Sequence, residues 1–248
     1  MDQPNTLAAR LLQVRRSGRR IAVPDAADAP RSLAEAYGVQ AAVTAGLGEM
    51  AGGYKVGIAA DGGTIFAPIH RSQIVMSGAS YACRPFDRVG IELELAFRFA
   101  RQVPAGAKPE EIRRAIDRVL VAIELCETRY TTNEGVAKHT ALADHQFNRG
   151  LVLGTELRFD PARDLPSVAS RWIIDGKPAL EKKASHPNGN PLAPLSTLPA
   201  AMAEQRRGLE PGDVVITGSL NGITWVKPGA RVEGQIDGVG SVAITIAP

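Results

Sequence analysis

The chain has 248 residues and a formal net charge of +3, with 44% hydrophobic and 22% charged residues. These values are ordinary for a globular protein that buries a sizeable core. No apolar run reaches the roughly 20 residues of a membrane-spanning helix, and the N-terminus lacks the apolar stretch of a secretory signal. The basic residues are scattered apart from Arg15, Arg16, Arg19 and Arg20, which we interpret as a solvated helix face. We therefore expect neither a membrane nor a nucleic-acid partner.

The cysteine content also restricts the classes of protein. Only Cys83 and Cys126 are present, and no CxxC or Cys/His spacing typical of a zinc site occurs. A disulfide framework is therefore poorly supported. We expect a cytoplasmic protein.

The first fifty residues predict two helices. Leu7, Leu11 and neighbouring apolar residues recur at helical spacing up to Gly18. A second helix follows Pro30, where Ser32 and Glu35 form an S-x-x-E capping box. The first predicted region is therefore an N-terminal helical segment, residues 1–53.

From Tyr54 onward the pattern changes to short strands separated by turn residues. Two further helices are predicted, over 109–119 and 196–207. The clearest predicted strands are 54–58, 74–76, 91–99, 119–126, 151–153, 214–217, 224–226, 231–236 and 241–246. The pattern lacks the regular strand–helix alternation of a doubly wound fold. It predicts an α+β protein whose helices pack on a curled, mostly antiparallel sheet.

The strand over 91–99 carries two acidic residues. Side chains alternate between the faces of a strand, so Glu92 and Glu94 share one face and the apolar residues share the other. On this pattern alone, a half-buried strand that shows its polar residues to water is the more ordinary interpretation.

A second acidic strand changes this interpretation. Glu124 lies in the nearly continuous apolar run of residues 119–126, and a buried carboxylate is costly unless it is paired. Three glutamates on neighbouring strands would repel one another unless a divalent ion joined them. Oxygen ligands favour a hard cation such as Mg²⁺ or Mn²⁺. The alternative is that Arg129 forms an ion pair with Glu124 or Glu127.

The order and spacing of several segments resemble the 2-oxopent-4-enoate hydratase/4-oxalocrotonate decarboxylase group of the fumarylacetoacetate hydrolase superfamily. The segments are AYGVQ (36–40), YKVG (54–57), GGTIFAPI (62–69), IELELAF (91–97), AIELCETR (122–129), DHQFNRGLVLG (144–154), SHPNGNPL (185–192), GDVVITGSL (212–220) and VEGQIDGVGSVAITI (232–246). The resemblance implies a catalytic domain over 54–248, with the sheet curled into a β-roll or barrel, and a homo-oligomer.

The resemblance also implies a set of site residues. The metal ligands fall on Glu92, Glu94 and Glu124, and Lys55 matches a lysine that contacts the substrate or its developing enolate. Without the resemblance, Lys55 would be read as a surface lysine. Asp61 only loosely matches a family acid, because the segment between Gly57 and Gly63 is short.

Four further residues are predicted near the substrate, namely Asp144, Arg149, Gly218 and Ser219. Asp144 matches the aspartate of the D-[NS]-x-x-x-x-G pattern. Arg149 replaces a smaller residue and is either a determinant of substrate choice or an ordinary loop residue. Gly218 and Ser219 lie in a turn whose backbone N–H groups suit a carboxylate; the alternative is a tight strand connection.

The implied activity is a metal-dependent hydratase that adds water to a 2-hydroxy-2,4-dienoate and forms a 4-hydroxy-2-oxo acid, as in aromatic meta-cleavage catabolism. Three alternatives stay open: a 4-oxalocrotonate-type decarboxylase, an acylpyruvate carbon–carbon hydrolase, and a non-catalytic scaffold. The expected partners are a small 2-oxo acid, other copies of the chain, and a related decarboxylase or hydratase.

Overall fold

The computed structural model describes residues 6–59, 61–82, 88–161, 167–205 and 207–248, with backbone alone at 167 and 180–185. Cys83 and part of the predicted helix over 196–207 lie outside these residues. The helices are α1 (Leu7–Ser17), α2 (Leu33–Leu47), α3 (Pro109–Ala115), α4 (Lys138–Ala143) and α5 (Ala193–Glu204), with short helical turns η1 (Arg71–Gln73) and η2 (His145–Phe147). None of the helices in the described ranges is both long and apolar enough to cross a membrane.

The strands form two sheets. They are β1 (Ala51–Ile58), β2 (Thr64–His70), β3 (Ile74–Met76), β4 (Ser80–Ala82), β5 (Val89–Phe99), β6 (Ile116–Cys126), β7 (Asn148–Arg158), β8 (Ser167–Ile174), β9 (Lys177–Ser185), β10 (Val214–Ser219), β11 (Thr224–Val226), β12 (Arg231–Ile236) and β13 (Gly240–Ala247). The larger sheet has the order β2-β1-β10-β5-β6-β7-β3, with β11 paired to β5. The smaller sheet has the order β4-β13-β12-β8-β9.

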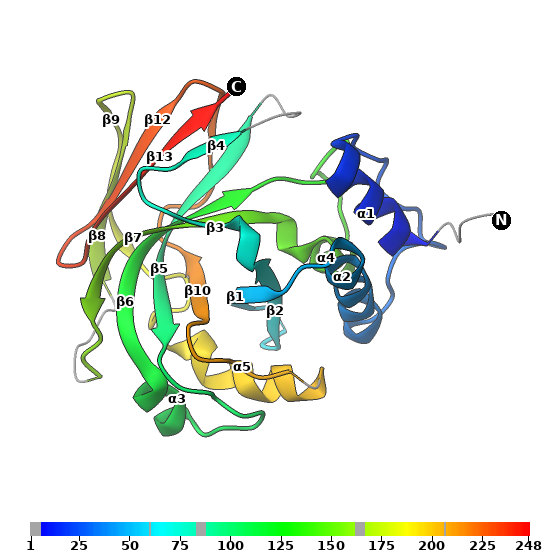
Figure 1. Ribbon diagram of the computed structural model, residues 1–248, viewed down its shortest axis with the longest axis horizontal. Helices are drawn as coiled ribbons and strands as arrows, with labels where there is room; N and C mark the ends of the chain where they lie inside the picture. The colour runs from blue at the N-terminus through cyan, green and yellow to red at the C-terminus, as the bar shows by residue number, and fades with distance from the viewer. Residues whose placement is uncertain (1–5, 60, 83–87, 162–166, 206) are drawn as a thin grey trace.

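The predicted fold class is confirmed. Only β1–β10, β3–β7 and β4–β13 are parallel among the strand pairs of the described chain, so the sheets are mixed and mostly antiparallel. The larger sheet curls into a half-barrel (Figure 1). Helices α1, α2 and α4 gather on one side of it, and α5 packs against β1 and β2.

A glycine ends each N-terminal helix, and the first helix ends at Gly18 as the sequence predicts. Gly18 and Gly48 close α1 and α2 in the left-handed region, with φ of 72° and 69°, which glycine adopts without a Cβ penalty. Ser32 Oγ accepts from the Glu35 amide, as predicted, whereas the Glu35 carboxylate accepts from the Arg31 amide rather than from Ser32. The division between 1–53 and 54–248 stays a prediction.

Other element boundaries differ from the prediction. The helix expected over 109–119 ends at Ala115, because the chain turns extended at Ile116 and enters β6. The hairpin of β8 and β9 was not predicted. Its turn is Asp175-Gly176, with φ of 51° and 75°, and this dipeptide is a strong hairpin signal.

Strand β5 lies at the centre of the larger sheet, between β10 and β6. Its apolar residues are fully buried, and Glu94 on the other face is only 2% exposed. The interpretation of a strand that shows its glutamates to water is therefore wrong for Glu94, whereas Glu92 is partly exposed. The fold places acidic side chains inside the curled sheet, where each needs a partner.

Candidate functional site

The three predicted glutamates meet on one face of β5 and β6. Glu92 lies directly opposite Glu124 in the antiparallel pair, and Glu94 lies opposite Ala122 on the same face. Strand β10 pairs with the other edge of β5 and brings Ser219 beside Glu94. The structure therefore brings Glu92, Glu94 and Glu124 together, as the strand alternation predicts.

Lys55 reaches this acidic face from β1. Its Nζ donates to both carboxylate oxygens of Glu124, at 2.7 and 2.9 Å, and to the backbone carbonyl of Gln146 at 3.3 Å. Asn148 also donates to Glu124, at 2.8 Å. Burial is the largest single influence and would lower the pKa of Lys55, but the charges of Glu124, Cys126 and Glu92 and the hydrogen bonds to Glu124 together raise it. Lys55 is therefore a charged, fixed group of the site.

One lysine does not neutralise three carboxylates. Burial raises the pKa of Glu92 and raises that of Glu94 well above its usual value, and the charge of Glu124 adds to both shifts. The amide of Gly218 donates to Glu94 at 2.7 Å, which is too little to offset the burial. The charge of Lys55 lowers the pKa of Glu92 and Glu94 less than burial and the charge of Glu124 raise it, so the site is short of positive charge at these two carboxylates.

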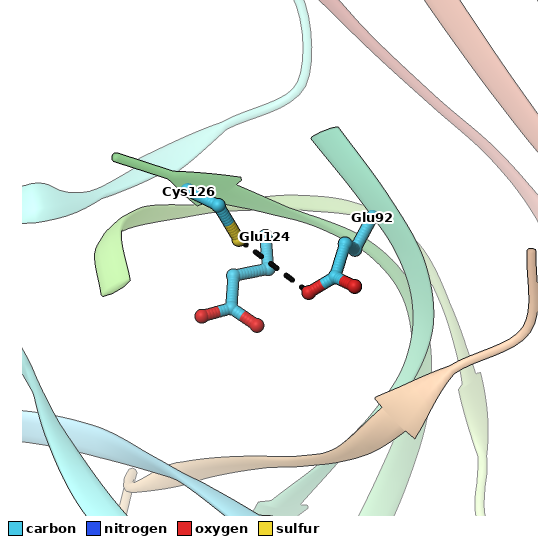
Figure 2. Close-up of side chains that lie close together, drawn as sticks. All are labelled: Glu92, Glu124 and Cys126. Carbon is cyan, nitrogen blue, oxygen red and sulfur yellow. Dashed lines mark hydrogen bonds between the residues drawn. The ribbon is translucent and has the colours of Figure 1, made fainter. Parts of the chain in front are cut away.

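Cys126 completes this cluster. Its side chain leaves β6 on the same face as Glu124, next to Glu92 (Figure 2). The thiol donates to Glu92 at 3.4 Å, and one ligand atom from each of Glu92, Glu124 and Cys126 lies within 4.8 Å of the others. Burial, followed by the charge of Glu124, raises the pKa of the thiol well above its usual value.

A cavity of about 180 Å³ opens beside these side chains. It is lined by Glu92, Cys126, Glu127, Thr128, Asn133, Gln146, Phe147, Ile223 and Trp225. Glu127 is buried, and its carboxylate oxygens accept no hydrogen bond from any described residue, although Arg149 Nε lies 3.4 Å away. Burial raises the pKa of Glu127 to about 7.

None of the four predicted substrate residues is among the described residues that line this cavity. Arg149 stands beside Glu127 and donates to the Tyr81 hydroxyl at 2.6 Å. Ser219 keeps a buried hydroxyl without a hydrogen-bond partner in the described chain. The Gly218 amide is already used by Glu94. Gly218 therefore orders a metal-ligand candidate instead of offering its N–H to a substrate in this arrangement.

Asp61 lies apart from the cluster. Its carboxylate is exposed, accepts from the Gly63 amide at 3.1 Å and pairs with Lys138 at 3.3 Å. These contacts, the amide first, lower the pKa of Asp61. A catalytic role for Asp61 stays a prediction to which this arrangement adds no contact with the glutamates.

Asp144 is fully buried and paired with two arginines. Its carboxylate lies 3.0 Å from Arg129 Nε and 3.5 Å from Arg15 Nη2, and it accepts from the Arg129 amide at 3.1 Å. Arg129 therefore pairs with Asp144 and not with the carboxylates of Glu124 or Glu127, which corrects the ion-pair alternative. Asp144 has no exposed surface through which a substrate could be bound.

The residues after Asp144 form a left-handed turn. His145, Gln146 and Phe147 have φ of 55°, 51° and 63°, a conformation that costs a non-glycine residue about 1–2 kcal/mol. The turn aims the Gln146 carbonyl at Lys55, while the Phe147 carbonyl accepts from the Glu127 amide at 2.9 Å. The strained turn therefore positions the lysine of the site.

Comparison with known proteins shows the family of this chain. Residues 59–247 match the family model described as the C-terminal domain of fumarylacetoacetate (FAA) hydrolase. The chain belongs to the fumarylacetoacetate hydrolase family.

Relatives within this family include hydratases and decarboxylases. A 4-oxalocrotonate decarboxylase of Pseudomonas sp. is 21% identical over 155 residues, covering 62% of this chain and 59% of the relative. A 2-keto-4-pentenoate hydratase of Burkholderia vietnamiensis is 27% identical over 257 aligned positions, covering 97% and 96%. The match thus spans less than two thirds of the first relative and nearly all of the second.

A solved structure of the same family has the same fold. The 4-oxalocrotonate decarboxylase from Pseudomonas putida G7, complexed with magnesium and adipate, superposes with a TM-score of 0.83 at 19% identity, covering 96% of this chain and 95% of that one. The fumarylpyruvate hydrolase from Pseudomonas aeruginosa, complexed with Mn²⁺ and pyruvate, gives a TM-score of 0.58 at 16% identity, covering 78% and 88%.

Sequence reasoning missed several residues around the candidate site. Arg15 was interpreted as part of a solvated face, but its side chain is 7% exposed and contacts Asp144 and His145; that interpretation is wrong for Arg15. Glu127 was considered only as an ion-pair partner. Cys126 was given no role, although it stands two residues after Glu124, a spacing that puts both side chains on one strand face.

Proposed function

We propose that this chain is a divalent-metal-dependent hydratase acting on a 2-hydroxy-2,4-dienoate of the 2-oxo-4-pentenoate type. The observation that carries the proposal is the arrangement of three carboxylates and one lysine inside the curled sheet. Glu92, Glu94 and Glu124 would hold the ion, and Mg²⁺ or Mn²⁺ suits their oxygen ligands. Membership of a family that includes 2-keto-4-pentenoate hydratases supports the proposal.

The residues fit such an ion because of their charge. The pKa values of Glu92 and Glu94 are raised because no positively charged partner offsets their burial and the charge of Glu124. A divalent cation would supply that positive charge. Lys55 already holds both oxygens of Glu124, so the ion must share Glu124 with Lys55. When bound, the ion supplies Lewis-acid stabilisation to the carbonyl or enolate oxygen of a 2-oxo acid.

The chain's own groups account for the remaining steps. A dienol loses its hydroxyl proton and gains a proton on its terminal carbon, and water then adds to the conjugated double bond that remains. Lys55 places a fixed positive charge beside the developing oxyanion. Glu127 lines the cavity with a pKa of about 7, which suits a group that takes and returns a proton near neutral pH.

The other predicted residues take indirect roles in this proposal. Gly218 holds Glu94, and Asp144 holds Arg129 and Arg15 behind the strained turn. Ser219 remains as a hydroxyl donor beside Glu94. We further propose that the chain works as a homo-oligomer, which light scattering on the purified protein would test.

A second candidate is the decarboxylation of a 4-oxalocrotonate-type diacid. Arg149 favours it, since this guanidinium lies beside the cavity-lining Glu127 and could bind a second carboxylate. In a decarboxylase, the 2-oxo group of the substrate would accept the electron pair of the broken carbon–carbon bond as carbon dioxide leaves.

The deciding experiment follows the ultraviolet absorbance of 2-hydroxypenta-2,4-dienoate and of 4-oxalocrotonate, with Mg²⁺ or with EDTA. The hydratase proposal predicts metal-dependent loss of the dienoate that Glu94→Gln abolishes. If 4-oxalocrotonate is consumed with release of carbon dioxide and the dienoate does not react, the protein is a decarboxylase and the hydratase proposal is wrong. If neither compound reacts while Mg²⁺ still binds, the substrate assignment is wrong.

A further inference from the structure

The cavity beside the acidic cluster has an apolar wall. Ile223 and Trp225 line it together with Phe147, and Ile223 and Trp225 are 45% and 36% exposed. Large apolar side chains that keep this much exposed surface beside a cavity are available to an apolar part of a ligand. Neither Ile223 nor Trp225 holds the ion or moves a proton in the proposed function.

The strand register places this wall next to the carboxylates. Trp225 of β11 is the Cα partner of Gly90 on β5, and Gly90 is the partner of Cys126 on β6. Paired residues share a face of the sheet, so the indole lies on the same face as Glu92, which is two residues after Gly90. Two residues of an antiparallel strand span about 7 Å, which is comparable to the length of a short carbon chain.

Both apolar side chains are held in place by their neighbours. An added Cβ at Gly90 would lie 2.5 Å from Ile223 Cδ1 and 3.2 Å from Cys126 Cβ, so Ile223 packs on the bare backbone of β5. The Arg88 guanidinium carbon lies 4.6 Å from the centroid of the Trp225 ring, a cation–π contact that fixes the indole. The wall is therefore formed before a ligand binds.

The lining offers no positive charge to a second carboxylate. The described residues around the cavity include the acidic Glu92 and Glu127 and no lysine or arginine. A carboxylate at the distal end of a substrate would leave water for apolar and acidic side chains, which is costly. An uncharged apolar group gains from the same burial.

We propose that Ile223 and Trp225 select a substrate whose distal carbon carries a small uncharged apolar group, so that the preferred 2-hydroxy-2,4-dienoate is alkyl-substituted. This inference rests on the proposed function, because the oxygens of the 2-oxo acid must face the ion for the distal carbon to reach the wall. One methyl group in a hydrophobic pocket changes kcat/KM by about tenfold or more.

The test compares kcat/KM for 2-hydroxyhexa-2,4-dienoate with that for 2-hydroxypenta-2,4-dienoate, which lacks the terminal methyl group. We expect a ratio of about ten in the wild type, a fall toward one in Trp225→Ala and in Ile223→Ala, and a smaller fall in Trp225→Phe, which keeps an aromatic ring. Circular dichroism of each variant confirms that it folds.

Ile58→Ala is the matched control. Ile58 is 36% exposed and lies outside the described lining of the cavity. The substitution removes the same atoms as Ile223→Ala, so we expect the wild-type ratio.

Tryptophan fluorescence provides a readout that needs no turnover. The chain has two tryptophans, and Trp172 is fully buried whereas Trp225 is partly exposed. With Mg²⁺ present, we expect 2-oxohexanoate, which has no double bond to hydrate, to change the emission of the wild type but not of Trp225→Phe. Pyruvate, which is too short to reach the wall, should change the emission of neither protein.

The outcomes separate this inference from the proposed function. If both dienoates react and the ratio is the same in the wild type, Trp225→Ala and Ile223→Ala, these side chains do not select the substrate and the hydratase proposal stands. A faster reaction of 2-hydroxyhexa-2,4-dienedioate would also overturn the apolar selection, in favour of a distal carboxylate bound by an arginine such as Arg88. If no dienoate reacts with Mg²⁺ present, the proposed function fails and the substrate class fails with it.

Discussion

Lys55 and Glu124 form a buried ion pair between two strands that are not neighbours, since β10 and β5 lie between β1 and β6 in the sheet. The pair spans the hollow of the curled sheet, with Lys55 side-chain exposure of 16% and Glu124 of 0%. A buried charge that loses its partner costs about 3–5 kcal/mol. The pair therefore fixes both the curvature of the sheet and the position of one ligand candidate.

We expect Lys55→Met to lower the unfolding free energy of the metal-free protein by about 3 kcal/mol, because Glu124 keeps an uncompensated charge. The double variant Lys55→Met/Glu124→Gln should lose much less than the sum of the two single variants. Urea denaturation of the four proteins measures this coupling. Strictly additive losses would show that the two side chains do not stabilise each other.

Arg15 connects α1 to the strained turn. Its guanidinium contacts His145 Nδ1 at 2.9 Å and Asp144 at 3.5 Å. We expect Arg15→Met to lower the unfolding free energy by about 3 kcal/mol and to reduce activity, because the turn that holds Lys55 loses its support. Arg19→Met, at an exposed position of the same basic cluster, should change stability by less than about 0.5 kcal/mol. Equal effects of the two substitutions contradict this assignment.

His70 makes stability depend on pH. Burial, followed by the charge of Arg15, lowers its pKa from 6.5 to about 4. Protonation therefore favours the unfolded chain, and stability is lost as the pH falls from 6.5 toward 4. Above pH 6.5 the histidine is neutral in both states and contributes no such loss.

We expect the unfolding free energy of the wild type to fall relative to His70→Gln across that interval, by up to about 3 kcal/mol. Glutamine can keep a hydrogen bond to Thr44, which lies 3.1 Å from His70 Nε2. His145, Glu49 and Arg129 also face His70, and they are present in both proteins. Parallel curves of unfolding free energy against pH would rule out His70 as the source.

Gly218 is required near the end of β10, where the pairing with β5 shifts register between Ile216 and Ser219. Its φ is +134°, and an added Cβ would lie 2.9 Å from the Pro187 side chain. We expect Gly218→Ala to cost about 1–3 kcal/mol and to weaken Mg²⁺ binding, because the amide that orders Glu94 shifts. Gly57→Ala, where an added Cβ meets no atom within 4 Å, serves as the control for urea denaturation and calorimetry. Unchanged Mg²⁺ binding in Gly218→Ala would show that the backbone at Gly218 does not order the metal site.

Much of the fold follows from local patterns. The glycine-capped helices and the strand that carries Glu92 and Glu94 were predicted because capping and two-residue alternation are local properties. The hairpin of β8 and β9 was not predicted, although Asp175-Gly176 marked its turn. The early end of α3 depends on the pairing of Ile116 with Phe99 of β5, a contact between distant parts of the chain.

In the site, too, local patterns were predicted and contacts between distant parts of the chain were not. The strand alternation predicted that Glu92 and Glu94 share a face, and the apolar run predicted that Glu124 is buried. Arg15 could not be placed from its helix alone, because its partners Asp144 and His145 lie more than a hundred residues away. Local sequence likewise does not show that the Gly218 amide is taken by Glu94, since only the pairing of β10 with β5 brings them together.

Binding of Mn²⁺ to the metal-free protein, followed by electron paramagnetic resonance, tests the central claim that the clustered carboxylates form a divalent-metal site. We predict stoichiometric binding by the wild type, loss of that binding in the folded Glu92→Gln/Glu94→Gln double variant, and unchanged binding in Asp61→Asn. Binding that persists in the double variant, or a wild type that binds no Mn²⁺, would contradict the account.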